Sequence, residues 1–267
     1  MRILVTNDDG VHSPGLLALR QQLERLGEVA VVAPQRNWSA GGHSRTLYQP
    51  LRAVETELAD GSQALACDGT PADCVALAVM GLLPERPDLI VSGINRGANL
   101  GSDVTYSGTV AAAMEGIILG IPSIAVSLVR GGKTVADFQA AGRWAAAVAE
   151  TAAAAGLAPD MLLNVNVPPG ALDAIGGAQV TRLGQRIYRN ELEVRHDPRG
   201  RPYYWTTGPD PEDMPDDGTD VGAIAAGMVS VTPLHLDLTS ARWVEALRDW
   251  VWRAPAASEP AAPDTPR

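Results

Sequence analysis

The sequence predicts an α/β fold in which a mostly parallel sheet carries helices on both faces. Short apolar runs alternate with helix-like segments through the first two-thirds of the chain, and this alternation is the signature of βαβ units. In addition, 46% of the 267 residues are hydrophobic, which is enough to form a core on both sides of such a sheet.

The expected strands are apolar runs bounded by turn residues, and the expected helices lie between them. The strands are Ile3–Thr6, Val29–Ala33, Ala64–Cys67, Leu89–Ser92, Ser123–Ser127 and Leu162–Val167. The helices cover residues 14–26, 71–82, 109–119 and 135–155. Pro14 and Pro71 fall in the first turns of their helices, where a missing N–H group costs nothing.

The pattern changes after about residue 180. Residues 187–207 are rich in β formers and are interrupted by Asp197-Pro198-Arg199-Gly200, a hairpin turn signal. A two-stranded ribbon is marginally stable alone, so we expect it to pack against something, with a second subunit as one candidate. Three further segments follow: an acidic loop over 209–220, a strand over 228–238 and a helix over 240–252.

These segments predict three parts of the chain. Residues 1–185 form the α/β core, residues 186–252 form a β-hairpin arm suited to oligomerisation, and residues 253–267 form a disordered tail. The tail is predicted because it is rich in alanine, proline and acidic residues, a composition that cannot build a packed core.

Charge and targeting signals restrict the function further. A net charge of −10 argues against a surface for polymeric nucleic acid, although a small phosphorylated substrate stays compatible with it. The two cysteines, Cys67 and Cys74, make no disulfide framework. Because neither a signal peptide nor an apolar run of membrane-spanning length is visible, we expect a cytoplasmic protein without a membrane partner.

Two adjacent carboxylates, Asp8 and Asp9, directly follow the first expected strand. Ligands gather at the carboxyl ends of strands in an open α/β sheet. Side-by-side carboxylates repel each other and therefore need a cation, a shared proton or open water. Asn7-Asp8-Asp9-Gly10 is also good turn chemistry, so a metal site and a solvated turn are about equally compatible with this tetrapeptide alone.

The segment from Ser92 to Val110 combines glycines with polar side chains between an expected strand and an expected helix. Gly108 and its neighbours let backbone amides approach a ligand, and a helix N-terminus offers free N–H donors. Ser107 and Thr109 add hydroxyl donors. This composition predicts a phosphate cradle, whereas the alternative is a solvated loop in which Ser107 is an ordinary helix cap.

Two more loops are expected at the same edge of the sheet. Asn95 follows the strand that ends at Ser92, and its amide oxygen beside Asp8 and Asp9 would make a hard oxygen site for Mg²⁺, Mn²⁺ or Ca²⁺. Ser39 follows the second strand, and its hydroxyl is a further candidate ligand, although for this residue alone a plain loop serine is much the more common case.

The general acid is not apparent from the sequence. His12 and His43 lie in the loops just described, and either could protonate a leaving group, but a structural role is more common for such isolated histidines. Gly132-Lys133-Thr134 resembles the end of a P-loop without its first glycine, and no G-x-G-x-x-G motif follows the first strand. These absences argue against a phosphate-binding P-loop and against a nicotinamide dehydrogenase.

Taken together, several segments resemble the SurE family of stationary-phase survival proteins, which are metal-dependent 5′/3′-nucleotidases. The matching segments are Thr6–Gly10, Ala33-Pro34 with Asn37 and Ser39, Gly69–Val75, Ser92–Gly116 and Val231–Leu234. Each segment is weak evidence alone, but five in order at suitable spacing are specific. The resemblance covers approximately residues 1–250.

The resemblance implies a Rossmann-like core with one divalent metal ion at the sheet edge. Carried over to this chain, the metal ligands would be Asp8, Asp9, Ser39 and Asn95. Mg²⁺ or Mn²⁺ is favoured over Ca²⁺ or Co²⁺. The phosphate-contacting Ser-Gly-Thr would be Ser107, Gly108 and Thr109, with Asn95 also holding phosphoryl oxygens. Members of the family exchange a C-terminal arm between subunits, which implies a homodimer or a homotetramer here. One departure is Ala40, where the family often has glycine.

The leading hypothesis is therefore a metal-dependent phosphomonoesterase that acts on nucleoside 5′- and 3′-monophosphates. Asp8 or Asp9 would accept the proton of the attacking water, and a phosphoenzyme on Asp8 is a less favoured variant. Two alternatives stay open. One is a broader phosphatase that also cleaves polyphosphate, and the other is a sensor that binds metal and nucleotide without turnover.

Overall fold

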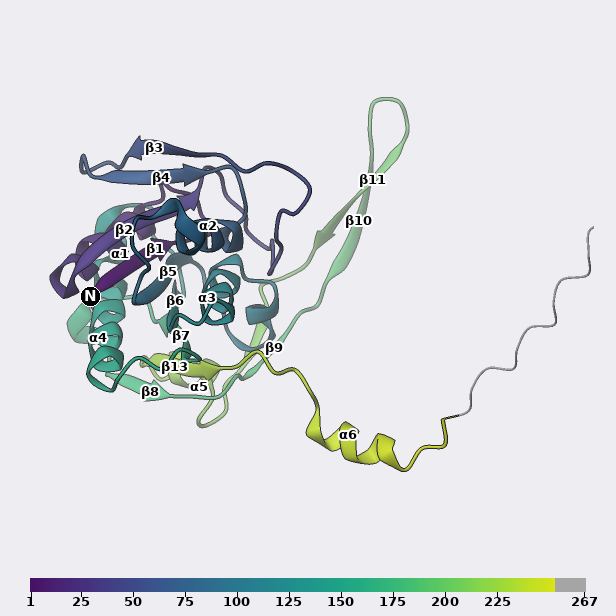
Figure 1. Cartoon of the computed structure of the whole chain (residues 1–267). Coiled ribbons are helices and arrows are strands. Elements are labelled where there is room, and N and C mark those ends of the chain that lie inside the picture. Colours follow the sequence, from purple (N-terminus) through teal and green to yellow (C-terminus); the bar gives the residue numbers. More distant parts are fainter. Residues whose placement is uncertain (253–267) are drawn as a thin grey trace, which may run out of the picture. The chain divides into compact units, whose positions relative to one another are not determined.

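A nine-stranded sheet forms the centre of the larger of two compact units, residues 1–235 (Figure 1). The computed structural model describes residues 1–252. The strand order is β3-β4-β2-β1-β5-β6-β7-β13-β8. These strands are β1 (Arg2–Thr6), β2 (Glu28–Pro34), β3 (Ala53–Glu57), β4 (Gln63–Cys67), β5 (Leu89–Arg96), β6 (Ser123–Leu128), β7 (Leu162–Val167), β8 (Ala178–Val180) and β13 (Val229–Leu234).

Six adjacent strands, from β4 through β2, β1, β5 and β6 to β7, are parallel. The edges are mixed, because β3 runs antiparallel to β4 and β13 runs antiparallel to β7. The expected α/β class is confirmed. The central strands read as continuous apolar runs because both faces of the sheet are covered, so that β6 is buried at every position.

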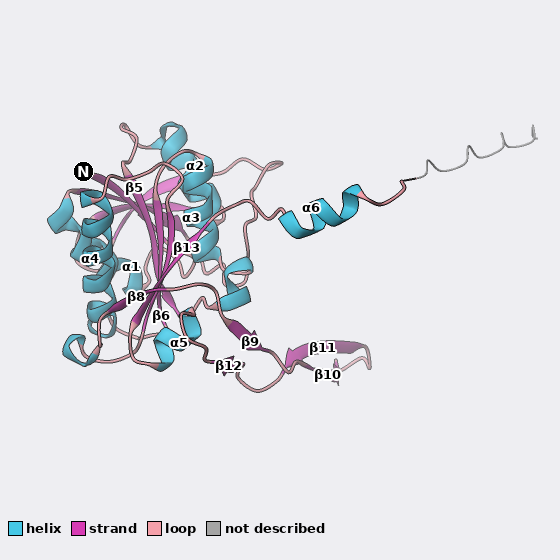
Figure 2. Cartoon of the chain, turned by 90° about the horizontal axis from the view of Figure 1, so that it is seen from below, coloured by secondary structure: helices cyan, strands magenta, loops and turns pink. Residues whose placement is uncertain are grey.

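Helices cover the two faces in pairs (Figure 2). On one face, α1 (Pro14–Leu23) and α4 (Gln139–Ala154) pack against the sheet, and on the other lie α2 (Pro71–Leu77) and α3 (Gly108–Ile118). Local sequence sets where these helices begin. Ser13 caps α1 by accepting from the N–H of Leu16, and Thr70 forms a capping box with Asp73 at α2.

The strand order places a crevice at the ends of β1 and β5. The chain leaves β1 towards β2 and β4, then returns to the other side of β1 to form β5. Such a reversal is the topological switch point at which open α/β sheets bind ligands. Asp8 and Asp9 follow β1, and Asn95 lies in the last part of β5.

Several elements differ from the sequence-based expectation. Strand β5 continues through a bulge to Arg96 and does not end at Ser92, because the sheet register resumes after the irregularity. The edge strand β3 is largely exposed and lacks the apolar run used to find strands. The expected loop over 209–220 contains β12 (Glu212–Met214), which pairs with β9 (Gln185–Ile187), and α5 (Asp220–Ala225) follows it.

The strand expected at 228–238 belongs to the main sheet. It forms β13, inserted between β7 and β8, and the larger compact unit runs to His235. The local pattern marks a strand but carries no information about its neighbours in the sheet.

The expected ribbon is formed by β10 (Glu191–His196) and β11 (Pro202–Thr207), which extend beyond the sheet in Figure 1. Asp197 sets the turn, since its Oδ1 accepts from the N–H groups of Arg199 and Arg201 at 2.8 and 2.9 Å. Leu192, Val194 and Tyr204 stay largely exposed on this ribbon.

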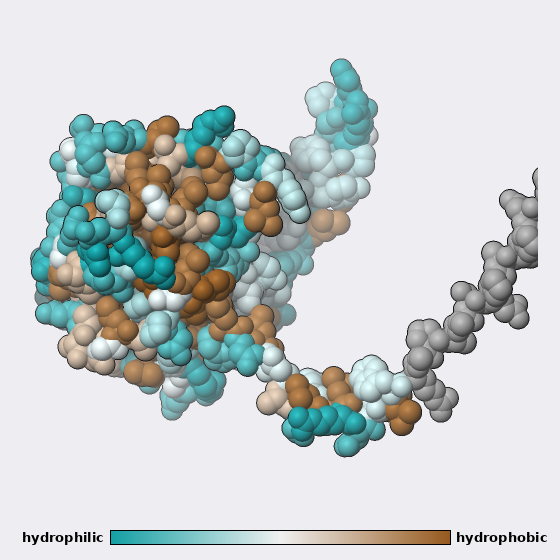
Figure 3. All heavy atoms as spheres, in the orientation of Figure 1, coloured by the Kyte–Doolittle hydropathy of each residue, from teal (hydrophilic) through white to brown (hydrophobic). Residues whose placement is uncertain are grey.

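Residues 236–252 belong to the second unit and contain α6 (Ala241–Arg248), which is shorter than the helix expected over 240–252. Ser240 caps it by accepting from the N–H of Trp243. Figure 3 shows apolar and polar side chains separated on this helix. The disordered tail expected over 253–267 lies outside the described residues. Within residues 1–252, every helix is too short or too polar to cross a membrane.

Candidate active site at the carboxyl edge of the sheet

Asp8 is held between the end of β1 and the start of α3. Its side chain is buried, with 4% of its surface exposed. Thr109 donates a hydrogen bond from Oγ1 to Oδ1 of Asp8 at 2.5 Å, and the backbone carbonyl of Asp8 accepts from the N–H of Trp38 at 2.8 Å. Gly108 packs directly against the carboxylate, because a Cβ at that position would lie 2.9 Å from Oδ2 of Asp8.

Asp9 is held from two further loops and is less buried than Asp8. Its Oδ1 accepts from Nδ2 of Asn37 at 3.2 Å, and its Oδ2 accepts from the backbone N–H of Arg96 at 3.0 Å. The loop after β2 and the end of β5 therefore both contact the carboxylate that follows β1. The structure brings together three of the segments that the sequence placed at one sheet edge.

The electrostatics of the two carboxylates favour a cation between or beside them. Burial raises the pKa of Asp8, the charge of Asp9 raises it further, and the hydrogen bond from Thr109 partly offsets this rise. Burial also raises the pKa of Asp9, with the N–H of Arg96 acting in the opposite direction. Two buried neighbouring carboxylates are costly to ionise together, and a divalent cation removes that cost.

The N-terminus of α3 adjoins Asp8, as the sequence indicated for residues 107–109. Ser107 is the N-cap, and its Oγ accepts from the N–H of Val110 at 3.1 Å. The hydroxyl of Thr109 is directed to Asp8. Both hydroxyls thus have partners within the protein, and the helix N-terminus supplies the partial positive charge that favours an anion there.

Asn95 and Ser39 lie on the segments that hold Asp9, but neither forms a hydrogen bond with Asp8 or Asp9 within residues 1–252. Asn95 donates from Nδ2 to the carbonyl of Gly97 at 3.0 Å, which leaves its Oδ1 as a neutral oxygen donor. Ser39 donates its backbone N–H to Oδ1 of Asn37 at 2.7 Å. The next residue, Ala40, has φ of 58°, a left-handed conformation that favours glycine.

The donor chemistry fits a hard divalent ion. Asp8 and Asp9 supply carboxylate oxygens, Asn95 supplies an amide oxygen and Ser39 a hydroxyl, which are ligands that Mg²⁺ and Mn²⁺ accept. Across the described part of the chain, no three His, Cys, Asp or Glu side chains gather into a metal-binding group. An ion at this edge would therefore depend on the amide and hydroxyl oxygens in addition to the two carboxylates.

The two histidines have different surroundings. His12 is exposed and lines a cavity of about 670 Å³ that opens at Asp9 and is also lined by Arg36 and Arg96. His43 instead pairs with the buried Glu115 of α3, its Nε2 lying 2.9 Å from Oε2. Glu115 lies about two helical turns beyond Gly108, so His43 is part of a structural contact away from the aspartates.

Arg45 extends the contact of His43 into a network that fixes the loop after β2. It bonds Asp73 at the start of α2, Nε to Oδ1 at 3.0 Å, and it also bonds Glu115. The backbone N–H of Thr46 donates to the same carboxylate of Asp73. This network ties the loop that carries Asn37 and Ser39 to both helices of one face.

Sequence reasoning missed the residues that anchor the loop between Asn95 and Ser107. Asp103 in this loop accepts from Nη1 of Arg186 at 2.5 Å and from the hydroxyl of Tyr188 at 2.7 Å. The buried Asp220 accepts from the N–H groups of Gly101 and Gly184 at 2.9 and 2.6 Å. No local signal marks these pairs, because the partners lie far apart in the sequence.

Comparison with known proteins shows the family of this chain. The sequence pattern that defines the family described as "Survival protein SurE" matches residues 3–190, a span that includes β1, the loop after β2, β5 and α3. The chain belongs to the SurE family. The resemblance inferred from five short segments is thereby confirmed.

Close SurE relatives span nearly the whole chain. A protein of Herpetosiphon aurantiacus named 5'-nucleotidase SurE is 64% identical over 94% of this chain and 99% of its own length. A protein of the same name from Chloroflexus aggregans is 59% identical over 94% of this chain and 100% of its own. The crystal structure of a SurE protein from Aquifex aeolicus superimposes with a TM-score of 0.80 at 43% identity, covering 93% of this chain and 98% of that one.

Proposed function

We propose that this SurE protein is a metal-dependent phosphomonoesterase that hydrolyses nucleoside 5′- and 3′-monophosphates to nucleoside and phosphate. The enzyme class rests on family membership, since relatives up to 64% identical over 94% of the chain are named 5'-nucleotidases. The structural observation that carries the proposal is the pair of adjacent carboxylates, buried Asp8 and half-buried Asp9, beside the N-terminus of α3.

The site residues divide into two roles. Asp8, Asp9, Ser39 and Asn95 would hold one divalent ion, Mg²⁺ or Mn²⁺ in preference to Ca²⁺ or Co²⁺. When bound, the ion supplies charge neutralisation for phosphate and lowers the pKa of a bound water. Ser107, Gly108 and Thr109 would place the phosphate at the N-terminus of α3, with Asn95 contacting its oxygens. Phosphoryl transfer depends mainly on this positioning and charge stabilisation.

The two aspartates differ in accessibility, and this difference supports different tasks for them. Asp9 is less buried than Asp8 and borders the cavity that His12 and Arg96 also line. It is therefore the better placed of the two to accept a proton from water. Asp8 is enclosed by Thr109 and Gly108, an arrangement that fixes its carboxylate in one orientation.

The assembly and compartment are part of the proposal. The ribbon of β10 and β11 leaves Leu192, Val194 and Tyr204 largely exposed on one face, and such a surface is typical of a contact between subunits. We therefore propose a homodimer or a homotetramer formed through this arm. The buried free thiols of Cys67 and Cys74 suit a reducing compartment such as the cytoplasm.

The test is phosphate release from a panel of nucleoside 5′- and 3′-monophosphates with Mn²⁺ or Mg²⁺, repeated with excess chelator. We expect release that depends on the metal and falls by orders of magnitude in Asp9→Asn. The matched control is Asp160→Asn, which removes a carboxylate at an exposed turn and should leave the rate unchanged. Full activity of Asp9→Asn with unchanged metal affinity would overturn the site assignment.

The same panel distinguishes the two alternatives. A sensor would bind nucleotide and metal but release no phosphate with any metal. A broader phosphatase would show comparable kcat/KM values for short polyphosphates and for nucleoside monophosphates.

A further inference from the structure

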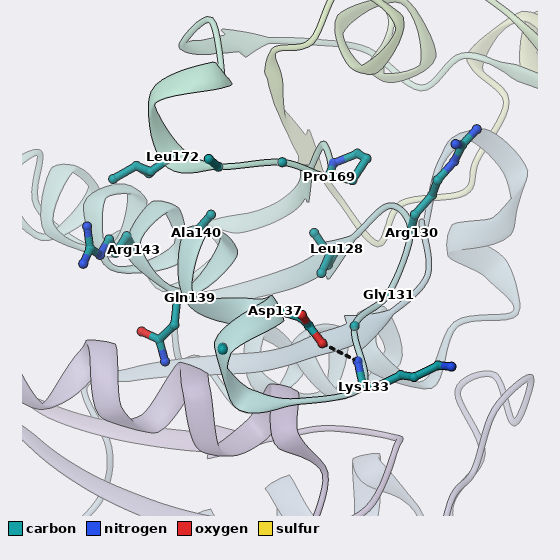
Figure 4. A pocket seen from close by; sticks show the side chains of 14 residues that line it. Leu128, Arg130, Gly131, Lys133, Asp137, Gln139, Ala140, Arg143, Pro169 and Leu172 are labelled. Carbon is teal, nitrogen blue, oxygen red and sulfur yellow. Dashed lines mark hydrogen bonds between the residues drawn. The ribbon is translucent and has the colours of Figure 1, made fainter.

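A second cavity, which we call the Arg130 pocket, lies beside the cavity at Asp9. It has a volume of about 660 Å³, and Gly132 and Lys133 line both cavities. Its walls come from the end of β6, the loop after β6, α4 and the loop after β7 (Figure 4). The pocket therefore lies at the carboxyl ends of two further parallel strands, where open α/β sheets place ligands.

The cations of this pocket lack carboxylate partners. Arg130, Lys133 and Arg143 line it, and within residues 1–252 none of them forms an ion pair. Elsewhere the chain pairs many of its arginines, for example Arg20 with Asp60 and Arg182 with Asp216. In a protein with 31 acidic and 21 basic residues, three exposed cations without ion pairs around one cavity make its rim locally positive.

The single carboxylate in the lining, Asp137, forms no ion pair with these cations, although its pKa is lowered by the backbone N–H groups of Lys133 and Thr134 and, to a smaller extent, by the charge of Lys133. Its Oδ2 accepts from the N–H groups of Lys133 and Thr134, both at 2.8 Å, and from the hydroxyl of Thr134 at 3.0 Å. Asp137 thus closes the loop before α4, with its charge satisfied by groups of that loop. An anionic ligand would meet the guanidinium and ammonium groups without displacing an existing salt bridge.

The arrangement of the lining indicates what kind of anion fits. Figure 4 shows Arg130 and Arg143 on opposite sides of the pocket with Leu128 and Ala140 between them, and both exposed guanidinium groups are directed outward from this apolar floor. One compact phosphate would reach only one of the two arginines. A ligand that satisfies both needs two separated anionic groups and a less polar part to cover the apolar floor.

We propose that the Arg130 pocket binds a small organic molecule carrying two separated phosphate groups, at a place distinct from the aspartate pair. Arg130 and Arg143 contact one phosphate group each, and Lys133 contributes a third positive charge. This inference goes beyond the proposed hydrolysis and does not require it. The ligand is either a separate molecule or the distal part of a substrate whose other end reaches Asp9.

The first test is equilibrium binding of adenosine 3′,5′-bisphosphate to the full chain by calorimetry, in excess chelator so that no metal-bridged contact forms. We expect it to bind at least about tenfold more tightly than 5′-AMP, because a second charge-assisted contact contributes at least that factor. The Arg130→Gln/Arg143→Gln double variant should lose that preference. Equal affinities for the two probes, or no binding of the bisphosphate, would overturn the proposal.

The matched control is the Arg199→Gln/Arg201→Gln double variant. It removes the same charge from two arginines at the turn of the β10–β11 ribbon, which also form no ion pair within the described residues. We expect its affinity for the bisphosphate to match that of the unchanged protein. An equal loss of bisphosphate affinity in both double variants would show that net charge alone causes the effect, and it would contradict a specific site at the Arg130 pocket.

Lys133 provides an independent readout, because it is the only lysine of the chain. Acylation of Lys133 with a limiting amount of an amine-reactive reagent can be followed by mass spectrometry. The N-terminal amine of Met1 serves as the internal reference. Bound bisphosphate should slow the modification of Lys133 and leave that of Met1 unchanged. If Lys133 reacts at the same rate with and without saturating bisphosphate, the ligand does not occupy this pocket.

Two further arms separate the sources of the ligand from each other and from the proposed enzyme activity. If the bisphosphate raises the KM for 5′-AMP in the presence of metal, the two compete, and the natural ligand of the pocket is the distal part of a substrate. If the KM for 5′-AMP is unchanged with bisphosphate bound, the natural ligand is a separate molecule. Asp9→Asn should lose hydrolysis but keep bisphosphate binding in chelator, and Arg130→Gln/Arg143→Gln should keep basal 5′-AMP hydrolysis. These two variants therefore distinguish a failure of the proposed hydrolysis from a failure of the proposed bisphosphate binding.

Discussion

Thr109 donates a hydrogen bond from its Oγ1 to Oδ1 of Asp8 across 2.5 Å. The contact joins the start of α3 to the end of β1, and the two elements lie on neighbouring layers of the fold. It also lowers the pKa of a carboxyl group that burial raises. One hydroxyl therefore both orients Asp8 and helps to keep it ionised.

Removing that hydroxyl should impair activity in a pH-dependent way. In Thr109→Val the pKa of Asp8 rises further, so the acid limb of kcat/KM should move to higher pH and activity near neutral pH should fall by about tenfold or more. Thr109→Ser keeps the donor and should restore most of the activity. A pH profile of the valine variant that overlays that of the unchanged protein would contradict this role of Thr109.

Position 108 requires glycine because the side chain of Asp8 packs against it and leaves no room for a Cβ atom. A Cβ in Gly108→Ala would lie 2.8 Å from Cβ of Asp8 and 2.9 Å from its Oδ2, so either the carboxylate or the helix start must shift. We expect a stability loss of about 1–3 kcal/mol and a larger proportional loss of metal affinity. Thermal unfolding and metal titration measure the two effects, and unchanged metal affinity would show that Asp8 does not move.

The raised pKa values also predict how stability depends on pH. The folded protein keeps protons on Asp8 and Asp9 to higher pH than the unfolded chain does. Their contribution to stability is therefore fully present below the ordinary carboxyl pKa and is lost as the pH rises through the raised folded values. Metal-free protein should consequently lose part of its stability between mildly acidic and neutral pH, and divalent metal should restore it.

Asp8→Asn tests the origin of this pH dependence. Without metal at neutral pH the variant should be more stable than the unchanged protein, since it removes a buried charge. A gain of about 1 kcal/mol would appear as a rise of ~2–4 °C in Tm. The difference should shrink at acidic pH and reverse with saturating metal. Lower stability of the variant under all three conditions would exclude a burial penalty as the cause.

Self-association through the ribbon should depend on its apolar face. Val194 and Tyr204 are opposite each other in the β10–β11 pair, and both are about half exposed. Val194→Asp places a charge on that face and should shift the protein towards monomers in sedimentation velocity. Arg195→Asp is the control on the opposite face of the same strand. An oligomeric state unaffected by Val194→Asp would direct the search to another surface.

The sequence alone predicts the parts of the site that are set by local chemistry. Asp8 and Asp9 follow a short apolar run, and Ser107 precedes a helix, so strand end and helix cap are both readable from neighbouring residues. Asn37 and Arg96 as partners of Asp9 were not predictable, because they contact it through a side-chain amide and a backbone N–H whose directions depend on the folded loops.

The difference between local patterns and contacts made only in the folded chain also explains which strands were predicted correctly. Leu162–Val167 was predicted with the observed bounds because four of its six residues, Leu162, Leu163, Val165 and Val167, are apolar and lie between turn residues. Ala53–Glu57 was missed because an exposed edge strand needs no apolar run. The pairing of β13 with β7 is a contact between distant segments, and a local pattern gives no information about the partner.

The position of β13 determines when the sheet can be completed during synthesis. The chain emerges from the ribosome with its N-terminus first, so β7 and the helices around it are available long before residues 229–234. Until those residues arrive, β7 has an open edge with unpaired backbone groups, and β8 has no place in the sheet. An open edge is a template for pairing with other chains. A nascent chain that stalls before Val229 would therefore be more prone to aggregation than one that has released its last strand.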